Sequence, residues 1–347
     1  MRPTLSVVVC TLHRPEAVRR VLAALAEQEV VADEVLVVDA SDDDRTAAVV
    51  ASAAGPPGLA HRPVGPEGRG LTRQRNVGIE RSSGDLVAFL DDDTVPEPRY
   101  VAELLACFER HPDAAGVGGT IVEADWRRAR AARTPSGWYR SGDWERPEGA
   151  RWRLRRRLGL DGGLPPGWMP PGGHGRPVAF LAPDGADHEV EFVMGGASAW
   201  RRPVLLAHRF DPGFEGYGLY EDLELCLRAG AEGPLHVAGA ARLAHHHAPE
   251  ARPDHRRYGR MVVDNGWYVW RRRWPEPRIA DRLRWWATTI VLALCRAAGG
   301  AAGRAEAAGR LAALPGTLAC ELSPAHARRR YAAHEHVDDV RERDHRA

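Results

Sequence analysis

Short apolar runs alternate with amphipathic segments over the first 90 residues of the chain. The runs at 5–10, 34–39 and 86–90 are predicted strands, and the segments at 15–28, 46–54 and 71–81 are predicted helices. Continuous apolar strands separated by helices are typical of a mostly parallel sheet that helices cover on both faces. The sequence therefore predicts an α/β fold.

Polar side chains follow these strands at their carboxyl ends. Thr11 and Asp39 close the first two runs, and three aspartates at 91–93 close the third. In open α/β sheets, ligands bind beyond the carboxyl ends of the strands. We therefore expect these three segments to converge on one crevice.

The aspartate triplet concentrates negative charge where the sheet opens. If extended geometry continues through it, Asp91 and Asp93 point to the same side and can share one ligand. Mg²⁺ and Mn²⁺ take oxygen ligands and commonly bridge carboxylates to substrate phosphates. The triplet thus predicts a metal-held phosphorylated substrate. The alternative is a solvated strand end whose aspartates cap a helix that begins near Pro96.

The periodic pattern disappears between residues 125 and 189, where Trp, Arg, Pro and Gly dominate. A segment of this length without regular structure is typical of an insertion or a functional lid. Regular structure is predicted to resume at 190–194. The glycines that follow, Gly195 and Gly196, would let the backbone approach a ligand closely, although a turn before a helix explains them equally well.

A second acidic site is predicted at the start of an amphipathic helix, where Glu221 and Asp222 stand in the first turn. A carboxylate at the positive end of a helix stays ionised, so Asp222 can accept a hydroxyl proton from a substrate within reach. Helix capping alone is the alternative. Further along, His245, His246 and His247 end another predicted strand; they are candidate metal ligands or part of a solvated loop.

Taken in order, these motifs resemble the family 2 glycosyltransferases of the GT-A fold over the first ~270 positions. The resemblance rests on segments in both halves of the chain. They are residues 7–15, the strand that ends in Asp39, residues 71–78, the D-x-D-like Phe89-Leu90-Asp91-Asp92-Asp93, the glycine turn at 195–197 and the E-D pair Glu221-Asp222.

The resemblance implies an inverting transfer of one sugar from a nucleotide sugar (UDP-, GDP- or dTDP-linked) to an acceptor hydroxyl of a glycan, a lipid-linked sugar or a small molecule. It also assigns roles. The residues that it implies for donor binding are Thr11, Arg14, Asp39, Arg73, Asn76, Asp91 and Asp92. The implied ligands of Mn²⁺ or Mg²⁺ are Asp93 and His245, with His246 and His247 as open alternatives. Gly195, Gly196 and Glu221 would lie on the acceptor side, and Asp222 would be the catalytic base.

Other functions fit the sequence less well. A sugar nucleotidyltransferase or a dinucleotide-dependent oxidoreductase needs a glycine-rich loop after the first strand, where this chain has residues 11–15 instead. A net charge of +1 gives no reason to expect nucleic acid as a partner. A catalytically silent nucleotide-sugar-binding or scaffold protein of the same fold stays an alternative, but its signature would be loss of Asp93 or Asp222, and both are present.

The resemblance divides the chain into a GT-A domain at 1–270 and a helical C-terminal extension at 271–347. Within the domain it predicts a nucleotide-binding half at 1–124, a variable insert at 125–189 and an acceptor half at 190–270. Trp270-Arg271-Arg272-Arg273-Trp274 keeps only the final Arg-Trp of the Q-x-x-R-W motif of processive synthases. This favours transfer of a single sugar, or a short extension.

A cytoplasmic location is expected from five scattered cysteines and from the absence of a recognisable signal segment. The apolar run at 285–295 is about half as long as the ~20 residues that cross a bilayer. It carries Trp285, Trp286, Ile290, Leu292 and Leu294 amid arginines. A helix of this kind either packs against the main domain or makes a peripheral contact with the inner face of the membrane.

Overall fold

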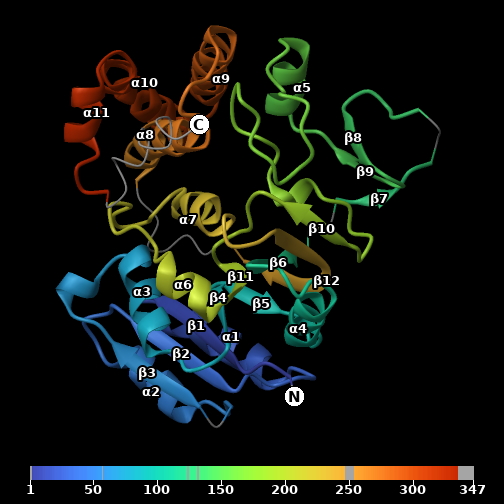
Figure 1. Cartoon of the computed structure of the whole chain (residues 1–347), viewed down its shortest axis with the longest axis vertical. Coiled ribbons are helices and arrows are strands. Elements are labelled where there is room, and N and C mark those ends of the chain that lie inside the picture. Colours follow the sequence, from blue (N-terminus) through green and yellow to red (C-terminus); the bar gives the residue numbers. More distant parts are fainter. Residues whose placement is uncertain (1, 57, 123–124, 131–132, 247–253, 335–347) are drawn as a thin grey trace.

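A large central sheet organises the chain (Figure 1). The computed structural model describes residues 2–56, 58–122, 125–130, 133–246 and 254–334. The strands of this sheet are β1 (Leu5–Thr11), β2 (Glu34–Asp39), β3 (Leu59–Pro63), β4 (Leu86–Asp91), β5 (Thr94–Pro96), β6 (Gly116–Ile121), β10 (Asp187–Val190), β11 (Ala197–Arg201) and β12 (Leu235–His245). Their order is β10-β12-β6-β11-β4-β1-β2-β3, and β5 pairs with β12.

Six of the nine strands of this sheet run in the same direction. β1 is parallel to β2 and β4, β2 to β3, and β12 to β6, whereas β11 is antiparallel to both of its neighbours. β10 and β5 are antiparallel to β12. The mostly parallel sheet is therefore confirmed. Because β1, β4 and β12 point the same way, their carboxyl ends lie at one edge.

Helices cover both faces of the sheet, as the apolar strands require. They are α1 (Pro15–Ala26), α2 (Arg45–Ser52), α3 (Leu71–Arg81), α4 (Tyr100–Arg110), α6 (Arg202–Ala207) and α7 (Glu221–Ala229), with a short 3-10 turn η1 (Pro66–Gly68). Val7 and Val9 pack on the face that carries α1, α2 and α4, whereas Val8 packs on the face that carries α3, α6 and α7. This alternation is the two-residue period of a strand. The expected α/β class is confirmed.

The predicted bounds of the elements agree with the structure in some cases and differ in others. β2 and α3 begin and end at the predicted residues, but α1 ends at Ala26 and α2 spans Arg45–Ser52. No helix begins near Pro96: that residue ends β5, and α4 starts at Tyr100.

The insert has regular structure that its composition did not predict. β7 (Arg127–Arg128), β8 (Trp138–Ser141) and β9 (Trp144–Pro147) form a separate three-stranded sheet, followed by α5 (Ala150–Arg157) and a 3-10 turn η2 (Val178–Phe180). Strands of two to four residues are too short to display a period. Glu145, nearly buried on β9, instead joins them through ion pairs with Arg127 and Arg140.

The strand predicted at 190–194 was misplaced. β10 spans Asp187–Val190, and the next residues leave the sheet because the backbone N–H groups of Glu191 and Phe192 donate to the carbonyl of Gly167. A new strand, β11, then starts directly after the glycine pair.

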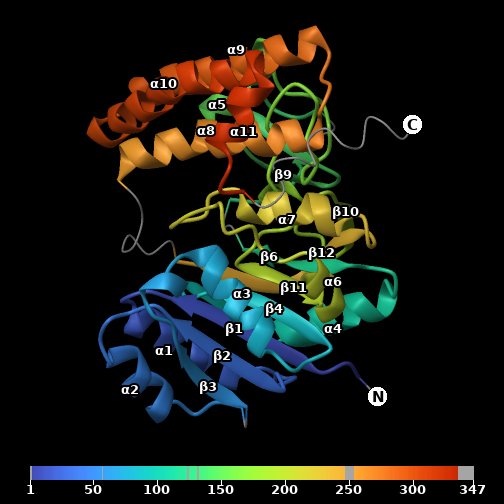
Figure 2. The same ribbon diagram turned by 60° about the vertical axis from the view of Figure 1, so that its left-hand side comes forward.

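The C-terminal part is a helical bundle, as expected. It contains α8 (His255–Arg273), α9 (Ile279–Ala297), α10 (Ala301–Leu322) and α11 (Pro324–Arg330), which lie together beyond α7 at one end of the molecule (Figure 2). Its core is aromatic: Trp285 stacks on Trp270 at 5.3 Å between ring centroids. The predicted boundary at residue 270 falls inside α8, and the domain limits stay predictions. No described helix is long and apolar enough to cross a membrane.

Candidate active site

A cleft of about 800 Å³ opens at the sheet edge where β1, β4 and β12 end. Segments far apart in the sequence line it, as the strand-end argument predicted. Its predicted residues are Thr11, Arg14, Arg73, Asp91, Asp92, Asp93, Gly195, Gly196, Glu221, Asp222 and His245. The structure therefore brings most of the predicted site together, although the role of each residue stays a prediction.

Three potential metal ligands gather in the cleft. One ligand atom from each of Asp91, Asp93 and His245 lies within 4.8 Å of the other two. His245 reaches this position because β12 pairs with β5, and its Nε2 lies 3.1 Å from Oδ1 of Asp93. Two carboxylates and an imidazole form a donor set suited to Mn²⁺ and acceptable to Mg²⁺.

Of the other two histidines of the run, only His246 is among the described residues, and it does not belong to the cluster. The side chain of His246 is exposed, and its backbone N–H donates to the carbonyl of Asp93 at 2.9 Å. His247 lies outside the described residues. Among the described histidines, His245 is therefore the one that the fold places beside the aspartates.

Asp92 faces inward between its two neighbours in sequence. Its side chain is fully buried, accepts a hydrogen bond from Oγ1 of Thr11 at 2.7 Å and pairs with Arg14 at 2.6 Å. Burial raises the pKa of Asp92 to about 7, although Arg14 and Thr11 oppose the rise. Arg14 also reaches Asp93 at 3.6 Å. In this geometry Asp92 holds Thr11 and Arg14 in place, so its predicted contact with the donor would require a rearrangement.

Asp222 lies in the first turn of α7 with its carboxylate fixed by backbone groups. Oδ2 accepts from the N–H of Gly195 at 3.0 Å, and Oδ1 accepts from the N–H of Leu223 at 2.8 Å. Burial nevertheless raises the pKa of Asp222 above its usual value. A more basic carboxylate in a defined orientation, lining a cleft, has the properties of a general base.

Arg75 is the site residue whose importance the sequence analysis missed. Its guanidinium is buried on α3, 2.6 Å from Glu221 and 3.2 Å from Asp91, and 5.0 Å from the ring centroid of Phe210. Burial and the nearby Asp222 raise the pKa of Glu221, while the attraction of Arg75 opposes the rise. Arg75 thus ties the first aspartate of the triplet to the E-D pair.

The sequence did contain a signal for Arg75. It shares the inward face of α3 with Thr72, Gly78 and Ile79, at helical spacings of three and four residues. A charged side chain at a core-facing position of a helix needs a partner of opposite charge inside the protein.

The glycine pair is required by close packing. A Cβ on Gly196 would lie 2.1 Å from Cγ of Asp91, and one on Gly195 would lie 2.5 Å from Nη1 of Arg75. The backbone N–H of Asp91 also donates to the carbonyl of Gly196 at 3.1 Å. The glycines therefore allow side chains of the site to approach the backbone closely. Their predicted approach to a ligand stays a prediction.

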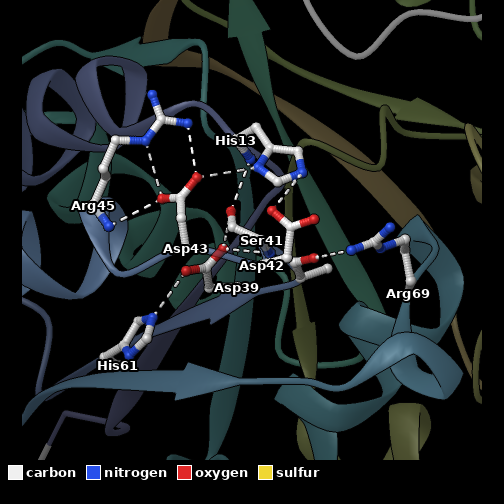
Figure 3. A network of polar contacts seen from close by, with 9 residues as sticks. His13, Asp39, Ser41, Asp42, Asp43, Arg45, His61 and Arg69 are labelled. Atoms are coloured by element: carbon white, nitrogen blue, oxygen red, sulfur yellow. Dashed lines mark hydrogen bonds and ion pairs between the residues drawn. The ribbon is translucent and has the colours of Figure 1, made fainter.

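Asp39 belongs to a polar network beside the cleft (Figure 3). It is 2% exposed, accepts hydrogen bonds from the backbone N–H and the hydroxyl of Ser41, and lies 3.0 Å from Nε2 of His61. Among the described residues that line the cleft, Asp39 is absent. Its predicted contact with the nucleotide base stays a prediction, and the ligand would have to compete with Ser41 and His61.

Asn76 and Arg73 differ in placement although both lie on α3. Both functions of the Asn76 amide bond the backbone of Phe210, at 2.8 and 2.9 Å, which makes it a strut between α3 and the loop after α6. Arg73 is exposed and lines the cleft. Arg73 donates from Nη1 to the backbone carbonyl of Glu67 at 3.2 Å. Of the two residues, Arg73 is therefore the one placed to meet a phosphate in the cleft.

A second cavity of about 200 Å³ adjoins the site and shares Met194 with the cleft. Trp126 and Trp144 of the insert line it together with the end of β6. The insert therefore contributes aromatic surface next to the residues that precede Gly195.

Comparison with known proteins gives a family match within the N-terminal half of the chain. Residues 6–162 match the model described as "Glycosyl transferase family 2". A curated relative from Haloferax volcanii, named glucosyl-dolichyl phosphate glucuronosyltransferase, is 40% identical over 73 residues, which are 21% of this chain and 23% of that protein. The chain therefore matches less than a quarter of that relative's length.

Solved structures give more distant likenesses. A structure of GalNAc-T7 with UDP, GalNAc and Mn²⁺ is 16% identical with a TM-score of 0.48, covering 75% of this chain and 48% of that one. Residues 1–349 of S. aureus TarS are 14% identical with a TM-score of 0.44, covering 87% and 68%.

Proposed function

Since residues 6–162 match the model of glycosyl transferase family 2, we propose that the chain is a metal-dependent, inverting glycosyltransferase. It moves one sugar from a nucleotide-sugar donor to an acceptor hydroxyl. One observation supports this most directly: the cluster of Asp91, Asp93 and His245 lies in the same cleft as the fixed carboxylate of Asp222. Such a reaction needs a cation for its leaving group and a base for its nucleophile.

The donor half of the cleft suits a nucleoside diphosphate. Asp91, Asp93 and His245 would hold Mn²⁺ or Mg²⁺, which when bound stabilises negative charge on the departing diphosphate. Arg73 lines the same cleft and can pair with phosphate oxygens. Arg14 also lines it, but would first have to leave its ion pairs with Asp92 and Asp93. Arg75 is not available for that role, because Glu221 and Asp91 already occupy its guanidinium.

The acceptor half contains the proposed base. Asp222 would remove the proton from the acceptor hydroxyl as that oxygen attacks the anomeric carbon. The hydrogen bonds from Gly195 and Leu223 keep its carboxylate oriented, while burial makes it more basic than an exposed aspartate. A single displacement from the side opposite the leaving group inverts the anomeric configuration.

The acceptor would approach from the side of Met194, where the aromatic cavity of the insert begins. A tryptophan face suits either a sugar ring or an apolar chain. The name of the Haloferax volcanii relative makes a lipid-linked sugar the first acceptor to test. Free glycans and small molecules follow.

Removing the proposed metal ligand is expected to abolish metal-assisted donor binding. In titration calorimetry with UDP, GDP and dTDP, the wild type should bind one of them at least about tenfold more tightly with Mn²⁺ than with EDTA. Asp93→Ala should lose this difference, because the remaining carboxylate and imidazole cannot complete the site.

Asp143→Ala is the matched control, since that carboxylate is 90% exposed in the turn between β8 and β9 and should leave the metal effect intact. Equal nucleotide affinity with Mn²⁺ and with EDTA in the wild type would contradict the proposed function. A metal effect without any sugar transfer would instead favour a silent nucleotide-sugar-binding protein.

The transfer rate is expected to fall on the acid side of its pH profile. Asp222 must be ionised to act as a base, and burial places its pKa above the usual 3.8. Protonation therefore removes activity as the pH falls through this raised value. Measuring kcat/KM against pH, with donor affinity measured at each pH, separates this loss from weaker metal binding. A rate that stays constant down to pH 3.8 would argue against the assignment.

A further inference from the structure

The helical bundle exposes a stripe of large apolar side chains along α9. Ile279, Leu283, Ile290 and Leu294 are 77%, 65%, 41% and 59% exposed. Their spacings of 4, 7 and 4 residues place them on one face of the helix. The opposite face is the one that packs, through Trp285. The stripe is therefore not needed to hold α9 in the bundle.

A second stripe runs along α10. Leu311, Leu318 and Leu322 are 43%, 46% and 76% exposed, again at spacings that share a helix face. α9 and α10 lie side by side as an antiparallel pair (Figure 2). Arg282 near the start of α9 lies 3.5 Å from Glu321 near the end of α10. Leu283 follows Arg282, and Leu322 follows Glu321. The contact therefore brings the two leucines to the same end of the bundle.

Basic charge accompanies these stripes. Between residues 274 and 330 the sequence has nine arginines and four carboxylates, although the whole chain carries a net charge of only +1. Three of the four carboxylates, Asp281, Glu306 and Glu321, are engaged in ion pairs with arginines of the bundle. The segment that carries both stripes therefore has an excess of positive charge.

We propose that α9 and α10 together form a docking surface for an anionic lipid bilayer. Apolar side chains flanked by arginines are the composition of helices that lie in the headgroup region, where the apolar stripe is buried and the arginines meet lipid phosphates. The helices rest on the bilayer, since no described helix can cross one. Charge distinguishes this occupant from a second copy of the chain, whose bundle would carry the same positive excess.

Vesicle sedimentation tests this surface without any measurement of sugar transfer. Wild-type protein should sediment with vesicles of phosphatidylcholine and phosphatidylglycerol, and less with phosphatidylcholine alone or at high salt. The double variant Leu283→Asp/Leu322→Asp should bind the anionic vesicles at least about tenfold more weakly, because two apolar side chains that would be buried in the bilayer are replaced by carboxylates. Its thermal unfolding should match the wild type, since both side chains are mostly exposed.

Leu206→Asp is the matched control, because Leu206 is an exposed leucine of α6, on the sheet and away from the bundle. It should sediment like the wild type. Wild-type protein that stays in the supernatant with anionic vesicles would overturn the proposal. So would a dimer, measured by light scattering without lipid, that the double variant dissociates while vesicle binding is unchanged. Either result leaves the proposed glycosyl transfer untouched.

Discussion

Asp222→Asn is expected to lower kcat/KM for sugar transfer by roughly 10²- to 10⁴-fold, the range that general-base catalysis contributes. The amide has nearly the same shape as the carboxylate and retains one oxygen for the N–H of Gly195 or of Leu223. It cannot accept the proton of the acceptor hydroxyl. Transfer should therefore be lost while nucleoside diphosphate affinity stays near that of the wild type, which separates a catalytic role from a structural one.

The measurement is the rate of nucleoside diphosphate release with the donor selected by the binding titrations. Glu232→Gln serves as the control, because Glu232 follows α7, pairs with His208 at 2.9 Å and lies outside the described lining of the cleft. That variant should transfer at the wild-type rate. If Asp222→Asn also transfers sugar at the wild-type rate, the base lies elsewhere. If both the rate and nucleotide affinity fall together, Asp222 acts mainly by shaping the cleft.

The local pattern of the chain was enough to predict the sheet and its binding edge. The strands β1, β2 and β4 are continuous apolar runs, and α1 and α2 have periodic apolar faces. Strand direction and the meeting of Thr11 with the aspartates therefore followed from general rules. The bounds of β2 and α3 were found because glycine, proline or polar residues flank them.

Other features depend on contacts that no local pattern reveals. The sheet of the insert has strands of two to four residues, which ion pairs of Glu145 hold together across the sequence. The positions of Asp39 and Asn76 likewise depend on partners at His61 and Phe210, which the motif resemblance did not include. Motifs thus located the cleft, but only the fold shows which of their residues line it.

Arg75→Met is expected to lower the free energy of unfolding by about 3–5 kcal/mol, the usual loss when one partner of a buried ion pair is removed. The guanidinium is only 2% exposed and contacts both Glu221 and Asp91. Methionine fills part of the volume but leaves Glu221 buried without its partner. Urea denaturation at neutral pH measures the loss. Arg73→Met, an exposed arginine two residues away on α3, should change stability by no more than about 0.5 kcal/mol.

A double variant reveals how the destabilisation arises. If the unpaired carboxylate is its cause, Arg75→Met/Glu221→Gln should be more stable than Arg75→Met alone, because the neutral amide removes the buried charge. If packing against Phe210 is the cause, the second substitution should bring no recovery. A loss below about 1 kcal/mol for Arg75→Met would mean that water reaches Glu221, and that Arg75 is not what joins Asp91 of β4 to the start of α7.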